Sequence, residues 1–101
     1  MAFVIDTSAL HPSSRETLFT IDGVEYTIPK QVGGEVGLQA TQIAAEKDEL
    51  AATLFCVYQT IGKDAYDALC AVENLPKTTL AGILAVCRER VFGGMEEEGK
   101  G

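Results

Sequence analysis

Several features that mark enzymes and metal proteins are scarce in this sequence. It contains one histidine, His11, and three widely separated cysteines, Cys56, Cys70 and Cys87, without the Cys-x-x-Cys spacing of a zinc ribbon. A cysteine nucleophile needs a nearby base, but His11 lies beside Pro12 in a segment with no apolar pattern. We therefore expect no catalytic residue, no metal site and no cofactor, and we expect the cysteines to pack as small apolar side chains.

Signals for membrane insertion and for secretion are also lacking. No apolar run approaches the roughly 18 residues that a membrane-spanning helix requires. The start, Met1-Ala2-Phe3-Val4, has no basic region followed by an apolar one, and an odd number of cysteines is unusual for a disulfide framework. We expect the chain to work in a reducing cytoplasm.

Positive charge is in short supply. Lysine and arginine together number 8, against 15 aspartates and glutamates, which gives a net charge of -7. An acidic surface repels the phosphates of nucleic acids and anionic lipids instead of releasing their counterions. The charge balance therefore predicts neither a nucleic acid nor a membrane as partner.

What the sequence does contain is enough apolar material for one small domain. Hydrophobic residues make up 47% of the 101 residues and charged residues 23%, values typical of globular proteins. A core of this size supports one domain and not two. We expect a flexible arm over residues 1–14, one domain over residues 15–92 and an acidic disordered tail over residues 93–101.

A β-hairpin is the clearest local prediction. Two β-prone runs, Thr17–Ile21 and Val24–Ile28, flank Asp22-Gly23, the pair that favours a type I′ turn. Pro29 is expected to end the second strand because it has no N–H to donate.

Helical spacing of apolar residues dominates the rest of the chain. One helix is predicted between Asp48, as its N-cap, and Gly62, as its C-cap. A second is predicted after Asp64 and ends before Asn74-Leu75-Pro76, and a third runs from Thr78 or Thr79 to a stop at Gly93-Gly94. Arg88 and Arg90 are expected near its C-terminal end, where they favour the helix macrodipole. The third helix has an apolar stripe of Leu80, Ile83, Leu84, Cys87 and Val91.

One segment remains ambiguous between strand and helix. Gln31–Gly37 is predicted to be a connector, while Val36, Leu38 and Ala40 alternate like a strand before Ile43 and Ala44 adopt helical spacing. The predicted fold is thus α+β and mainly α, with an N-terminal β-hairpin followed by a small bundle of three to four helices.

The hairpin and the helices together resemble the tail assembly chaperones of long-tailed bacteriophages. Residues Phe19–Pro29 read FTIDGVEYTIP, which matches the early segment F-x-hydrophobic-D-G-x-x-Y-x-hydrophobic-P of that family. The apolar pairs Leu54-Phe55 and Tyr66 with Leu69, and the segment Leu80–Leu84, stand where the family has apolar helix positions. The resemblance spans residues 17 to 92.

The resemblance implies a non-enzymatic chaperone of the host bacterial cytoplasm that is absent from the mature virion. Its implied partners are the phage tape-measure protein, which it coats, and the tail-tube protein, which it recruits; self-association stays open. In this family a fraction of ribosomes shift frame near the end of the short product. Glu98-Gly99-Lys100 can be encoded GAG-GGA-AAG, which contains the slippery heptamer GGGAAAG, although synonymous codons lack it.

The residues that we expect to bind a partner lie at the two ends of the domain. They are Phe3, Val4 and Ile5 in the arm, and Val91 and Phe92 at the exit of the last helix. Two other functions stay open: a small structural virion protein, such as a head-tail connector or a minor tail protein, and an enzyme that depends on a reactive thiol.

Overall fold

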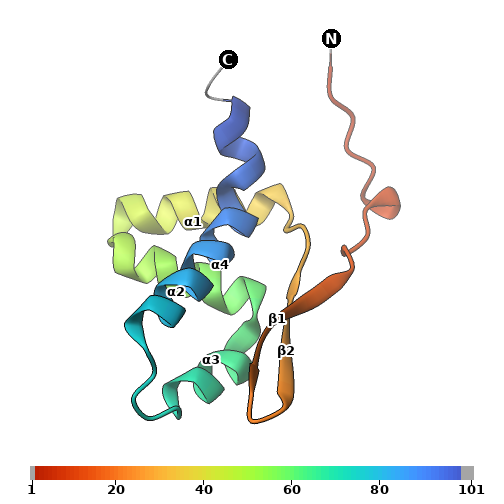
Figure 1. Cartoon of the computed structure of the whole chain (residues 1–101). Helices are drawn as coiled ribbons and strands as arrows, with labels where there is room; N and C mark the ends of the chain where they lie inside the picture. The colour runs from red at the N-terminus through yellow and green to blue at the C-terminus, as the bar shows by residue number, and fades with distance from the viewer. Residues whose placement is uncertain (1, 99–101) are drawn as a thin grey trace.

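The structure, a computed structural model, describes residues 2–98, with side chains described through residue 93. A two-stranded antiparallel hairpin packs beside a group of four helices, and the segment before the hairpin extends away from the body (Figure 1). The predicted α+β, mainly α fold is confirmed. In chain order the elements are a 3-10 turn Thr7–Ala9, β1 Arg15–Ile21, β2 Val24–Pro29, α1 Gly34–Glu46, α2 Glu49–Thr60, α3 Gly62–Cys70 and α4 Lys77–Glu98.

The hairpin turns where the sequence predicted. Asp22 and Gly23 have φ values of 50° and 85°, the positive pair that a two-residue type I′ turn requires. The strands pair from Ile21 opposite Val24, and a bulge between Thr17 and Phe19 shifts the register. The rings of Phe19 and Tyr26 stack with their centroids 5.2 Å apart. The hairpin thereby presents one apolar face to the helices.

The ambiguous segment is helix α1, so the strand-like alternation there was misleading. The helix begins at Gly34, so the connector ends at Gly33 and not at Gly37 as predicted. Val36, Gly37 and Ala40 are buried, at the i, i+1 and i+4 positions of one helical face that packs against α2 and α4. Tertiary burial of this face decides in favour of the helix.

The N-cap of α2 and the break between α2 and α3 lie where the sequence predicted them, but the predicted N-cap of α3 was wrong. The carboxylate of Asp48 caps α2 by accepting a hydrogen bond of 2.8 Å from the N–H of Ala51. Gly62 has a φ of 90°, the left-handed conformation that ends a helix. Asp64 was predicted to cap α3, but α3 begins at Gly62 and Asp64 lies inside its first turn, where a carboxylate still favours the helix dipole.

The predicted stop of the last helix at Gly93-Gly94 was wrong. Helix α4 continues to Glu98, because two glycines cost a helix about 1 kcal/mol each without blocking it, and no proline follows. Arg88 and Arg90 are therefore well before the helix end, and the expected pairing with its dipole does not apply. Of the predicted tail, residues 99–101 lie outside the described part of the chain.

The core has two parts that share α2 and α4. The smaller part joins Val36 and Ala40 of α1 to Cys56 of α2 and Val91 of α4. The larger part joins the hairpin to α2, α3 and α4 through the buried side chains of Ile28, Val57, Ile61, Ala65, Leu69, Ile83 and Cys87. Cys56 and Cys87 are buried, as predicted, and burial raises the pKa of each thiol.

Replacing Ile28 tests how the hairpin is attached. Ile28 is fully buried, so Ile28→Ala leaves a cavity between β2 and the helices and should lower the free energy of unfolding by about 3 kcal/mol. The control is Val24→Ala on the same strand, where the side chain is exposed and the loss should stay below about 1 kcal/mol. Urea unfolding followed by circular dichroism measures both; equal midpoints for the two variants would contradict this attachment.

Candidate docking site

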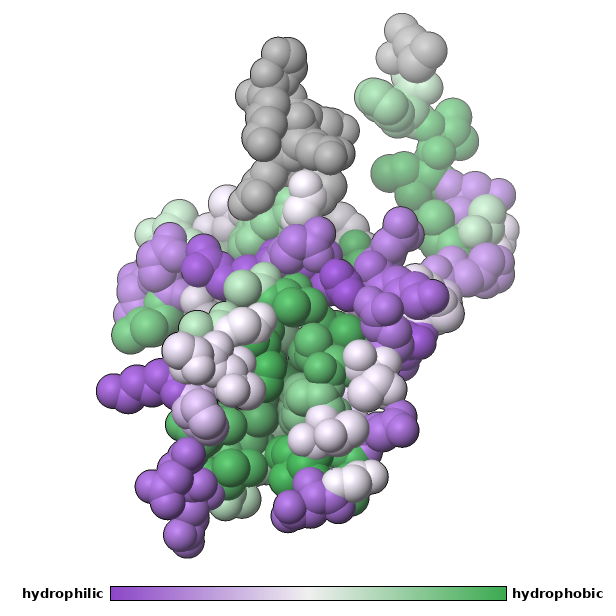
Figure 2. Space-filling view, viewed as in Figure 1, coloured by the Kyte–Doolittle hydropathy of each residue, from purple (hydrophilic) through white to green (hydrophobic). Residues whose placement is uncertain are grey.

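An apolar groove opens between α2, α3 and the first turns of α4. Its volume is about 300 Å³, and none of its lining residues is charged. Figure 2 shows apolar surface gathered in the lower half of the molecule, where Figure 1 places α3 and the start of α4. The lining residues are Leu50, Thr53, Leu54, Val57, Ile61, Tyr66, Leu69, Cys70, Leu75, Leu80, Ile83 and Leu84.

The α2 wall of this groove reaches into solvent. Leu50, Leu54 and Tyr58 follow one another at four-residue intervals, and their side chains are 81%, 37% and 38% exposed. The Tyr58 ring meets the Tyr66 ring of α3 edge to face, with centroids 5.2 Å apart. A stripe of large apolar side chains at helical spacing, left open beside a groove, is the surface that a second helix would cover.

Sequence reasoning missed this groove because its residues have the same spacing as core residues. Leu80 and Leu84 were assigned to the apolar stripe of the last helix, together with Ile83, Cys87 and Val91. The structure buries the last three and leaves Leu80 and Leu84 half-buried on the groove wall. The width of the apolar face of α4 was the signal that could have predicted the groove. One neighbouring helix does not cover so wide a face along its whole length, so part of it stays open.

The residues predicted to bind a partner divide into two groups. Phe3, Val4 and Ile5 are 92%, 90% and 78% exposed in the arm. Val91 is only 4% exposed, inside the smaller part of the core, and Phe92 is half-buried against that cluster. Burial therefore removes Val91 from the candidate surface, whereas Phe92 also lines two surface pockets beside Arg88, so its expected role in binding stays a prediction.

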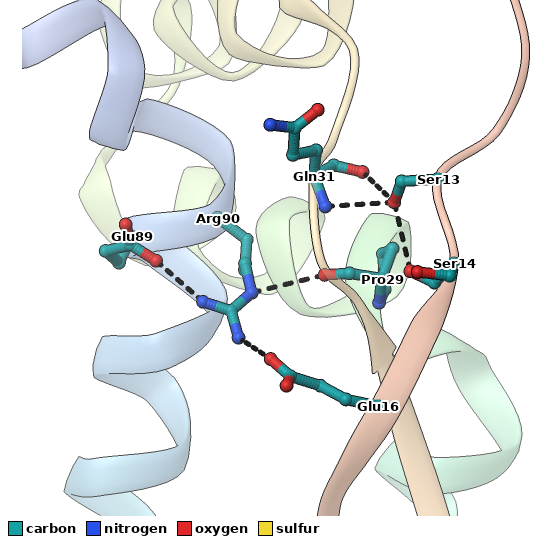
Figure 3. Close-up of polar contacts among 7 residues, drawn as sticks. All are labelled: Ser13, Ser14, Glu16, Pro29, Gln31, Glu89 and Arg90. Carbon is teal, nitrogen blue, oxygen red and sulfur yellow. Dashed lines mark hydrogen bonds and ion pairs between the residues drawn. The ribbon is translucent and has the colours of Figure 1, made fainter.

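The base of the arm is fixed to the hairpin although the arm itself extends away. The Ser13 hydroxyl donates a hydrogen bond of 2.9 Å to the carbonyl oxygen of Gln31. The backbone N–H of Gln31 in turn donates a hydrogen bond of 2.9 Å to the Ser13 hydroxyl oxygen (Figure 3). The N–H of Lys30 donates to the carbonyl oxygen of Ser14 at 2.9 Å. Residues 13 and 14 thus continue the hairpin, and the projecting part of the arm consists of the residues that precede Ser13.

Arg90 joins the same end of the hairpin to α4. Its guanidinium donates to the carbonyl oxygen of Pro29 at 3.2 Å and pairs with the carboxylates of Glu16 and Glu89 (Figure 3). Because Arg90 is mostly buried, these contacts orient the hairpin more firmly than an exposed ion pair would. The arm therefore leaves the body from a defined place and in a defined direction.

Cys70 is the exception to the predicted packing of the cysteines. It is the last residue of α3, where the chain turns away from the bundle, and its thiol is exposed at the groove. Among the side chains described, those of residues 2–93, no three histidine, cysteine, aspartate or glutamate residues lie close enough together to hold a metal ion. The groove therefore offers apolar contact surface and one thiol.

None of the described helices is both long enough and apolar enough to cross a membrane.

Comparison with protein families, with characterised proteins and with solved structures finds no match to this chain.

Thiol labelling tests the placement of the three cysteines. In the folded protein at pH 8, Ellman's reagent should react rapidly with one thiol, Cys70, because Cys56 and Cys87 are buried and burial raises the pKa of both. Denaturation should release the other two, and Cys70→Ser should abolish the rapid reaction. Rapid labelling of two or three thiols in the folded state would contradict the packing described here.

Proposed function

We propose that this chain is a non-enzymatic tail assembly chaperone of a long-tailed bacteriophage, which binds the tape-measure protein in the host cytoplasm and helps to recruit tail-tube subunits. The observation that supports the proposal is the open, uncharged groove between α2, α3 and α4. A chaperone needs a surface that covers the apolar side chains of another protein for a limited time, and this groove has that character.

The dimensions of the groove suit a helix with an apolar stripe. Its α2 wall runs from Leu50 to Ile61, which is about 16 Å along the helix axis, or three turns of a partner helix. Apolar side chains at positions i, i+4 and i+7 of such a helix would meet Leu54 of α2 and Leu80 and Leu84 of α4. The tape-measure protein, as a long helical chain, would present this stripe repeatedly.

The charge of the chain adds selectivity. The whole chain has a net charge of -7, and the groove has no charged lining residue. Basic residues that flank the apolar stripe of a partner helix would be attracted to this surface, and an acidic helix would be repelled. The domain would therefore favour apolar helices with lysine or arginine at their edges.

Temporary binding follows from the small size of the groove. A contact of about three helical turns is smaller than a stable protein interface, so each copy would bind weakly and dissociate quickly. Many copies along one tape-measure chain would cover it together, and tail-tube subunits would displace them one after another.

The second candidate function is a structural virion protein, and the arm favours it. Phe3, Val4 and Ile5 project from the body as an apolar segment, which is a common way to link neighbouring subunits of a particle. Mass spectrometry of purified virions discriminates between the two functions: a chaperone is absent, while a structural component is present in stoichiometric amounts.

A matched pair of leucine substitutions tests the role of the groove. Leu54→Lys places a charge in the α2 wall and should weaken binding to the tape-measure protein of the same phage at least tenfold. Leu38→Lys makes the same change at an exposed leucine of α1 outside the groove, and its binding should equal that of the unmodified chain.

Co-expression provides the measurement. The unmodified chain and Leu38→Lys should keep the tape-measure protein in the soluble fraction and co-purify with it, whereas Leu54→Lys should not, with its circular dichroism spectrum unchanged. Equal retention of the tape-measure protein by both variants would argue against the groove, and retention by none of the three chains would argue against the proposed function.

A further inference from the structure

The chain has two apolar surfaces that its own fold leaves uncovered. One is the groove, and the other is the arm, where Phe3, Val4, Ile5 and Leu10 are all exposed. Three consecutive large apolar residues in water represent an unfavourable surface that a contact with another apolar surface would remove.

The arm points away from the groove of its own copy. In Figure 1 it rises from the end of the hairpin opposite the Asp22-Gly23 turn, while α3 and the groove lie toward the turn. Its base is fixed by the contacts of Ser13 and Ser14 with residues 30 and 31. The eleven residues from Phe3 to Ser13 reach at most about 35 Å when extended. This reach is comparable to the 30 Å and 24 Å widths of the molecule, so the arm can cross to a neighbouring molecule.

Two copies of this acidic chain can meet most easily through surfaces that carry few charges. The chain has 8 basic and 15 acidic residues, yet residues 2–14 contain only one of these 23 charges, Asp6. The Asp6 carboxylate accepts hydrogen bonds from the N–H and the hydroxyl of Ser8, which hold it in its own 3-10 turn. Because the groove lining has no charge, an arm placed in a groove brings together two surfaces that carry little charge and repel each other little.

From these observations we infer that the free protein self-associates by placing the arm of one copy in the groove of a second copy. In an extended segment Phe3 and Ile5 lie on the same side, so they enter the groove against Leu54, Leu80 and Leu84, and Val4 faces the opposite side. The inference concerns the protein alone and does not depend on the proposed function. In a cell that contains the tape-measure protein, its helix would displace the arm from the groove.

The oligomeric state of the full chain is the first test. Sedimentation equilibrium from about 1 to about 500 µM should show an average mass that rises from 10.8 kDa to at least twice that value. Phe3→Ser/Ile5→Ser should remain at the mass of one copy over the same range, and its fold should be intact because both side chains are exposed. Leu38→Ser, which removes an equally exposed leucine elsewhere, should associate like the unmodified chain.

A mixing experiment identifies the contact. Leu50→Lys/Leu54→Lys has an intact arm and a charged groove, while Phe3→Ser/Ile5→Ser has an intact groove and no functional arm. Each alone should be monomeric. An equimolar mixture should form a complex of two copies and nothing larger, because it offers only one working arm and one working groove per pair.

A labelled peptide of residues 2–12 provides a readout that does not depend on the fold of the groove variant. It should bind Phe3→Ser/Ile5→Ser at one peptide per chain and should not bind Leu50→Lys/Leu54→Lys. A chain that stays monomeric at every concentration would overturn the inference, including the case in which each arm docks in its own groove. Association that persists in Phe3→Ser/Ile5→Ser, or a mixture that forms no complex, would overturn it as well.

Discussion

Packing of α2 against α4 is the contact on which the rest of this structure depends. Both parts of the core contain residues from these two helices: Cys56 with Val91 in one, and Val57 with Ile83 and Cys87 in the other. Helix α3, with 9 residues, is shorter than α2 with 12 and α4 with 22. Its residues Tyr66, Leu69 and Cys70 line one side of the groove, and apolar side chains of α2 and α4 line most of the rest.

This arrangement explains why the lining of the groove is mostly apolar and uncharged. Its walls are extensions of the core stripes of α2 and α4, so they consist of leucines such as Leu54, Leu80 and Leu84. If a partner helix binds as proposed, this surface would discriminate by shape and apolar area, and the acidic chain would attract a basic partner at long range. The arm is the second apolar surface. The hydrogen bonds of Ser13 with Gln31 and the contacts of Arg90 with Pro29 and Glu16 fix the end of the hairpin from which the arm extends.

Local chemistry in the sequence predicted most of the fold. The turn at Asp22-Gly23, the cap at Asp48 and the break at Gly62 depend on the residues themselves, so each was predictable. The α1 helix was not predictable from local signals, because it depends on the burial of Val36 and Ala40 against other helices. The continuation of α4 past Gly93-Gly94 was not predictable either, because a helix tolerates glycine at a modest cost. Val91 and Leu84 have the same helical spacing, but Val91 packs against Val36 and Ala40 of α1, whereas Leu84 lies on the groove wall.

We propose that a partner helix binds to the surface between α2, α3 and α4. Methyl chemical shifts of the leucines, measured by NMR as a helical tape-measure peptide is titrated into the protein, report such binding residue by residue. We expect the signals of Leu50, Leu54, Leu80 and Leu84 to shift together and saturate, while those of Leu38 on α1 stay unchanged. Shifts confined to Leu38 and Leu18, with the four groove leucines unaffected, would contradict it.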